Sequence, residues 1–130
     1  FLVPIVLLAL VSYNKIDITL DPFPYSGGTS SFESIWMAVP VLTKKGSKFI
    51  SCTTESINRN IEMSDWVARD ENEYVIKAME FSKNLEQLSK IKKKLILMAS
   101  ESPLFNASLF AEQFKNLIWQ IWEKFNNKNI

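Results

Sequence analysis

Residues 26–33 read SGGTSSFE and combine backbone freedom, hydroxyl groups and one carboxylate. Gly27 and Gly28 are two of only three glycines in the chain. Paired glycines allow positive φ and let a ligand approach the backbone closely. Thr29 and Ser30 add hydroxyl donors at the expected start of a helix, where unpaired N–H groups favour a phosphate. The stretch predicts either an anion site or an ordinary capped turn.

Glu33 has two possible roles in this stretch. Ser30 and Glu33 have the spacing of a capping box, in which the carboxylate satisfies a backbone donor. One turn into a helix at a nucleotide site, the same carboxylate could bind ribose hydroxyls. Spacing alone favours the cap. The stretch is neither a Walker A loop, because no Gly-Lys-Ser/Thr follows the glycines, nor a GxGxxG fingerprint.

The composition excludes several kinds of site. The chain has no histidine, so neither a Ser-His-Asp triad nor a Cys/His metal site can be built from it alone. A formal net charge of +1 gives no electrostatic case for nucleic acid or an anionic membrane surface as a partner. The single cysteine, Cys52, rules out an intramolecular disulfide and favours a reducing, cytoplasmic setting.

The elements around the glycine pair predict a small parallel sheet. Residues 16–20 alternate apolar and polar side chains, which is typical of a strand, and the prolines that follow exclude a helix over residues 21–25. A helix capped by Thr29 or Ser30 should come next. Residues 39–43 and, more weakly, 65–68 predict further strands. The apolar face of the expected helix consists of Phe32, Ile35, Trp36 and Val39.

From Asp70 onward the pattern is helical. Capping signals precede three helices, at Asp70 with Glu73, at Asn84 with Gln87, and at Asn106. The last helix carries an apolar stripe at helical spacing, formed by Phe110, Phe114, Leu117, Ile121 and Phe125. Such a stripe is usually core, so we expect this helix to pack on the sheet domain and a truncation at Pro103 to unfold or aggregate it.

These elements predict an α/β fold with a parallel sheet and a helical C-terminal tail. Ligands of such sheets bind outside the carboxyl ends of the strands, where the glycine pair lies. Residues 1–12 are apolar and shorter than the roughly 20 residues that span a bilayer. They are open to interpretation as a buried element or the edge of a fragment, as a signal or anchor, or as a partner interface. We take residues 13–130 as one domain.

The run IDITLDPFPYSGGTSSFESIWMAVPVLT, with GSKFIS and SPLFNASLFAEQFKNLIWQIWEKF after it, resembles the C-terminal catalytic region of O-linked N-acetylglucosaminyltransferases. These enzymes form glycosyltransferase family 41. The chain also resembles the bacterial members of this family, which are associated with tetratricopeptide repeats. The resemblance implies the second Rossmann-like half of a B-type glycosyltransferase. It also implies a uridine diphosphate (UDP) sugar as donor, UDP-N-acetylglucosamine above all, with no metal or other cofactor.

The resemblance assigns roles to individual residues. Gly27, Gly28, Thr29 and Ser30 would bind the UDP diphosphate, and Glu33 would bind the ribose. No catalytic residue is carried over, since the family's lysine near the phosphates lies upstream. Transfer to Ser or Thr of a protein acceptor would need the missing N-terminal half, so we expect this chain alone to be inactive. A non-catalytic UDP-sugar-binding module and a structural or interaction fragment are the alternatives.

Overall fold

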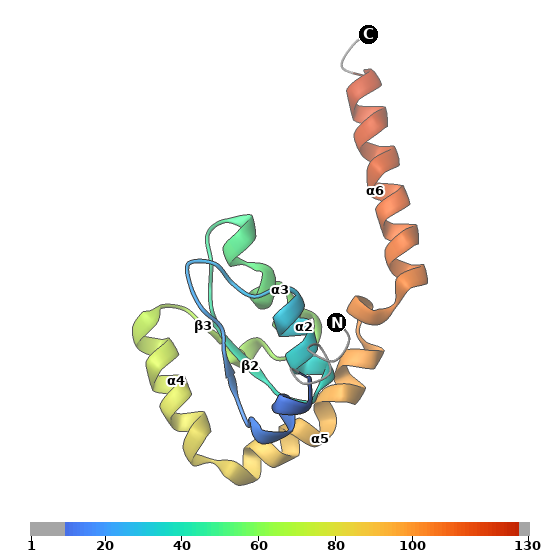
Figure 1. The fold of residues 1–130 in the computed structure, drawn as a ribbon. Coiled ribbons are helices and arrows are strands. Elements are labelled where there is room, and N and C mark those ends of the chain that lie inside the picture. Colours follow the sequence, from blue (N-terminus) through green and yellow to red (C-terminus); the bar gives the residue numbers. More distant parts are fainter. Residues whose placement is uncertain (1–9, 128–130) are drawn as a thin grey trace, which may run out of the picture.

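The computed structural model describes residues 10–127 and places a small parallel sheet at the centre of the fold (Figure 1). The strands β1 (Thr19–Leu20), β2 (Val41–Lys44) and β3 (Val67–Ala68) follow the order β1-β2-β3. Both pairings are parallel, with Thr19 opposite Val41 and Thr43 opposite Val67. The predicted α/β class with a parallel sheet is therefore confirmed. The interpretations of residues 1–12 fall mostly outside the described residues.

The strands are shorter than the sequence pattern predicts. Residues 16–18 precede β1, because strand pairing begins only where the Thr19 N–H donates to the Pro40 carbonyl over 2.9 Å. Val39 is buried but lies after the end of the helix at Trp36, so its assignment to the apolar face of that helix is wrong, and Trp36 itself is 56% exposed. Alternation of side chains thus marked the right segments, but hydrogen bonding to β2 sets their ends.

The helices cover both sides of the sheet. Figure 1 shows α2 (Thr29–Trp36) and α3 (Thr53–Asn60) on one side and α4 (Glu71–Lys83) on the other, with α5 (Leu85–Glu101) crossing beneath. Four short 3₁₀ helices join these elements: η1 (Tyr13–Lys15), η2 (Phe49–Ser51), η3 (Ser64–Trp66) and η4 (Pro103–Phe105). The core between the layers includes Ile35, Leu42, Ile57, Ile61, Trp66 and Leu95.

The predicted N-caps of the three later helices are confirmed. The side chain of Asp70 accepts from the Glu73 N–H over 2.9 Å, that of Asn84 from the Gln87 N–H over 3.0 Å, and that of Asn106 from the Leu109 N–H over 2.9 Å. The capping box at α4 is incomplete, since the Glu73 carboxylate binds the residue before the cap. Local spacing therefore located each helix start correctly.

The expected packing of the last helix is wrong. The helix α6 (Ala107–Asn127) extends away from the sheet domain, and η4 is its main neighbour (Figure 1). Its apolar stripe is exposed: Phe110 64%, Phe114 52%, Leu117 53%, Ile121 54% and Phe125 67%. Periodicity identified the apolar face correctly, but within the described residues no other element covers it. Among residues 10–127, no helix combines the length and apolar character needed to cross a membrane.

Glu73 gives a testable pH dependence. Its carboxylate accepts from the Arg69 N–H over 2.6 Å and from Arg69 Nε over 2.8 Å, and these bonds lower its pKa from 4.5 to about 2. A folded-state pKa below the unfolded value stabilises the fold above that unfolded value. This contribution should be lost as the pH falls from 4.5 toward 2.

We expect a carboxyl-carbon NMR titration of Glu73 to show a midpoint near pH 2. The variant Arg69→Met removes the side-chain hydrogen bond and should move the midpoint back toward 4.5. A midpoint at the ordinary value in the unsubstituted chain would contradict the pairing of these two residues.

Candidate functional site

The glycine pair lies at the carboxyl edge of the sheet, as the sequence predicts. The loop of residues 21–28 leaves β1 and leads directly into α2. The loops that leave β2 and β3 begin at the same edge, after Lys44 and Ala68. This is the edge at which parallel α/β sheets bind ligands.

The start of α2 carries unpaired polar groups. Its N-cap is Gly28, whose carbonyl accepts from the N–H groups of Ser31 and Phe32 at 3.1 Å each. The expectation that Thr29 or Ser30 caps this helix is wrong, because the helix already begins at Thr29. Both hydroxyls are exposed, and neither bonds to another residue in the described part of the chain. They remain available to a ligand.

Glu33 is not part of a capping box. Ser30 would have to be the N-cap for that arrangement, but it is the second residue of α2. The Glu33 carboxylate is partly buried and forms no hydrogen bond or ion pair with the described residues. It lies close to Tyr13, whose hydroxyl donates to the Ser30 carbonyl over 3.3 Å. Burial raises the pKa of Tyr13, and the charge of Glu33 adds to this effect.

The two glycines differ in how closely the surrounding atoms approach them. Neither has a positive φ, so the left-handed backbone that paired glycines allow is not used here. At Gly27 an added Cβ would collide with the Ser31 hydroxyl and lie 2.9 Å from that of Ser30. At Gly28 the nearest atom to such a Cβ is a Thr53 methyl group at 3.9 Å. Close packing therefore opposes a Cβ at Gly27, whereas a Cβ at Gly28 would make only an ordinary van der Waals contact.

Two side chains that the sequence analysis missed hold the loop. The Gly27 N–H donates to Asp21 Oδ1 over 2.7 Å, and the Thr54 hydroxyl donates to the Gly27 carbonyl over 3.0 Å. Asp21 is only 3% exposed and also accepts from the Thr43 hydroxyl over 2.7 Å. The only sign of this role in the sequence is that Asp21 directly follows a strand. Its partner, Gly27, lies six residues later on the same loop.

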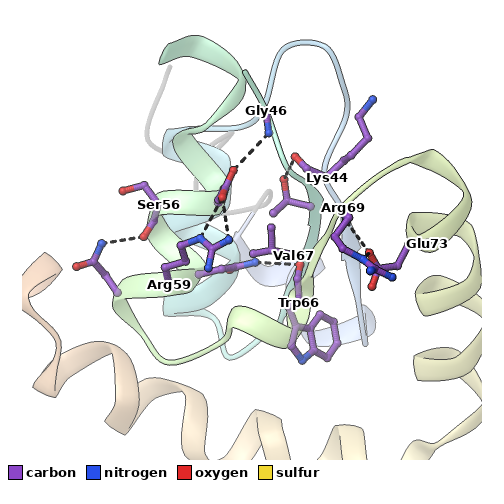
Figure 2. Close-up of polar contacts among 12 residues, drawn as sticks. Lys44, Gly46, Ser56, Arg59, Trp66, Val67, Arg69 and Glu73 are labelled. Carbon is purple, nitrogen blue, oxygen red and sulfur yellow. Dashed lines mark hydrogen bonds and ion pairs between the residues drawn. The ribbon is translucent and has the colours of Figure 1, made fainter. Parts of the chain in front are cut away.

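A cavity of about 320 Å³ opens beside this loop at the ends of β2 and β3. Its charged groups are largely paired: Lys44 Nζ lies 3.0 Å from Glu71 and 4.1 Å from the centre of the Phe23 ring. Figure 2 shows the ion pair of Arg69 and Glu73. It also shows the Gly46 N–H directed at the carboxylate of Glu55, which forms an ion pair with Arg59. The cavity is lined by Pro22, Phe23, Pro24, Ser26, Lys44, Lys45, Gly46, Ser47, Ser51 and Arg69.

The described residues contain no group of three or more His, Cys, Asp or Glu side chains that could hold a metal ion.

Comparisons with known proteins agree with this arrangement. The family model described as glycosyl transferase family 41 matches residues 13–114. The chain is 32% identical over 127 residues to the probable UDP-N-acetylglucosamine–peptide N-acetylglucosaminyltransferase SPINDLY of Solanum lycopersicum. It is 22% identical over 111 residues to the UDP-N-acetylglucosamine–peptide N-acetylglucosaminyltransferase of Caenorhabditis elegans.

These matches cover most of this chain and little of its relatives. The tomato match spans 95% of the chain but 14% of the relative, and the nematode match spans 85% and 10%. The K341M mutant of the Thermobaculum terrenum O-GlcNAc transferase superposes with a TM-score of 0.73 at 28% sequence identity, over 83% of this chain and 22% of that one.

Proposed function

Because this chain belongs to glycosyl transferase family 41, we propose that it supplies the donor-binding half of a protein glycosyltransferase. The donor is a UDP-sugar, UDP-N-acetylglucosamine in the first place, and the acceptor is a Ser or Thr hydroxyl of a protein. The observation that carries the proposal is the start of α2, where exposed hydroxyls and unpaired N–H groups lie at the carboxyl edge of a parallel sheet.

The donor diphosphate binds at the first turn of α2. The N–H groups of Gly28, Thr29 and Ser30 make no hydrogen bond to the described residues, and the helix dipole adds partial positive charge. When the sugar leaves, negative charge grows on the diphosphate, and donors that already point at it stabilise that charge. Gly27 contributes through its tight packing, since its own N–H is taken by Asp21.

Glu33 binds the ribose. It lies one turn into α2, and its carboxylate is not engaged by a cap. A carboxylate can accept hydrogen bonds from two neighbouring hydroxyls, which suits the ribose diol.

Catalysis requires more protein than this chain. It spans 14% of the tomato relative, and half of a cleft cannot hold donor and acceptor in a reactive geometry. The alternative of a non-catalytic UDP-sugar-binding module would keep donor affinity but fail to transfer sugar when the upstream half is added. A purely structural or interaction fragment would show no UDP affinity.

Titration with UDP tests the proposed site directly. We expect the backbone amide resonances of residues 28–31 to shift progressively at millimolar UDP. Amides of the last two turns of α4 (Glu71–Lys83) serve as the internal control and should stay in place, since the first turns of that helix contact the loop through Tyr74 and Asp21. If the α2 resonances remain unmoved, donor binding at this helix is excluded.

The variant Glu33→Gln tests the ribose assignment. Losing a hydrogen bond to a charged group should weaken UDP binding about tenfold or more. The melting temperature should not change, because Glu33 caps nothing and pairs with no described residue. Glu80→Gln on α4 is the matched control and should leave the affinity as it is. Equal UDP affinity in Glu33→Gln and the unsubstituted chain would disprove the ribose role.

A further inference from the structure

The backbone of Gly27 is held from two directions. Its N–H donates to Asp21 Oδ1 over 2.7 Å, and its carbonyl accepts from Thr54 Oγ1 over 3.0 Å. Asp21 follows the last residue of β1, and Thr54 lies in the first turn of α3. Their exposed fractions are 3% and 0%, so both side chains are buried, while Gly27 itself is partly exposed. The loop is thereby fastened to two separate elements.

Each of these two side chains is itself held in place. The second carboxylate oxygen of Asp21 accepts from Thr43 Oγ1 over 2.7 Å. The Thr54 hydroxyl shares a hydrogen bond of 2.8 Å with the hydroxyl of Ser31 on α2. Buried polar networks whose members are mutually bonded fix a single geometry. The network joins the end of β1, β2, α2 and α3 at one residue, Gly27.

The position of the Gly27 backbone determines the course of the chain into α2. Gly27 lies next to the N-cap residue Gly28, so a fixed Gly27 carbonyl and N–H set the direction of the N–H groups that follow. Free rotation is also limited by the close packing of Gly27 against Ser30 and Ser31. Asp21 occupies the Gly27 N–H and removes it from the set of possible anion donors.

We propose that Asp21 and Thr54 are positioning residues for the diphosphate of the donor, an inference that rests on the proposed function. Neither side chain touches the ligand. They hold Gly27 so that the donors from Gly28 onward point at the diphosphate before it binds. Hydrogen-bond donors that already point at the diphosphate stabilise its developing charge without having to reorient. The residues behind them keep the donors in that orientation.

The test compares near-isosteric variants of the network in the whole chain. Thr54→Val removes the hydroxyl that binds Gly27, and Thr43→Val removes the one that binds Asp21. Calorimetric titration with UDP should show a Kd about fivefold to tenfold higher in each variant. Thr54→Ser keeps the hydroxyl and should restore the affinity. Ile61→Val, a core substitution outside the network, is the control for lowered stability and should bind UDP normally.

A second readout needs no ligand. Hydrogen exchange of the Gly27 amide should be faster in Thr43→Val and Thr54→Val than in Ile61→Val. Unchanged affinity together with a lower melting temperature in Thr54→Val would reduce the network to a structural role and overturn the inference. If the unsubstituted chain does not bind UDP, the proposed function fails. The hydrogen-exchange rate of the Gly27 amide then decides alone whether Asp21 and Thr54 hold Gly27. Unaltered exchange would then overturn the inference as well.

Discussion

Gly27→Ala is expected to destabilise the chain by about 1–3 kcal/mol, the usual cost of overpacking, and to abolish measurable UDP binding. The added methyl group would collide with the Ser31 hydroxyl and lie 2.9 Å from the Ser30 hydroxyl and 3.1 Å from Asp21 Oδ1. Relief of these contacts requires the Ser31 hydroxyl to turn away from its hydrogen bond with Thr54, or the loop to shift away from Asp21. Either movement breaks a hydrogen bond of the network that holds Gly27.

The neighbouring glycine provides a matched control. Gly28→Ala introduces the same methyl group, but the nearest atom, a Thr53 methyl carbon, is 3.9 Å away. The φ of Gly28, −123°, lies outside the positive range that favours glycine. We therefore expect its free energy of unfolding to stay within about 1 kcal/mol of the unsubstituted chain. Urea unfolding and UDP titration of both variants measure the contrast, and equal effects at the two positions would refute the packing argument.

Local signals predicted the parts of this fold that depend on local interactions. The caps at Asp70, Asn84 and Asn106 each join residues three apart, so the sequence carries the whole motif. The same logic failed at α2, where Ser30 and Glu33 have the spacing but not the position of a capping box. There the loop held by Asp21 makes Gly28 the N-cap, so the helix starts two residues earlier than it would with Ser30 as the N-cap.

The candidate site could be predicted as a stretch of sequence, but the hydrogen bonds that hold it could not. The glycine pair and its hydroxyls identified the carboxyl edge of the sheet, and the family resemblance named a ligand for it. The contacts of Gly27 with Asp21 and Thr54 join residues from different elements. Their pairing depends on tertiary packing, which residue spacing does not encode. For the same reason the buried Asn58, which donates to the Val41 carbonyl over 2.8 Å, gave no signal in advance.

Periodicity also indicates which face of a helix is apolar without indicating what covers it. The stripe of α6 has the same helical spacing as the buried face of α5, yet Leu95 on α5 is 0% exposed and Leu117 on α6 is 53% exposed. The difference lies in the neighbours. α5 packs against α2 and α4, whereas α6 has only η4 as its main contact.

This difference predicts that a single substitution in α5 costs more than the loss of all of α6. Leu95→Ala removes a fully buried side chain and should lower the free energy of unfolding by about 2–5 kcal/mol. Deleting residues 107–130 removes the 21-residue helix α6, whose apolar side chains are already exposed to water. The deletion should therefore change the free energy of unfolding by less than about 1 kcal/mol, because little burial is lost.

Urea unfolding at low protein concentration compares the two variants, with tryptophan fluorescence reporting the core through Trp66, which is 3% exposed. Low concentration matters because an exposed apolar stripe promotes association between chains. The deletion should also leave the UDP-induced shifts at α2 unchanged, since α6 makes its main contact with η4 and not with the loop. A truncated chain that unfolds at clearly lower urea than the full chain would show that α6 docks on the sheet domain in solution. The stripe would then be part of the core after all.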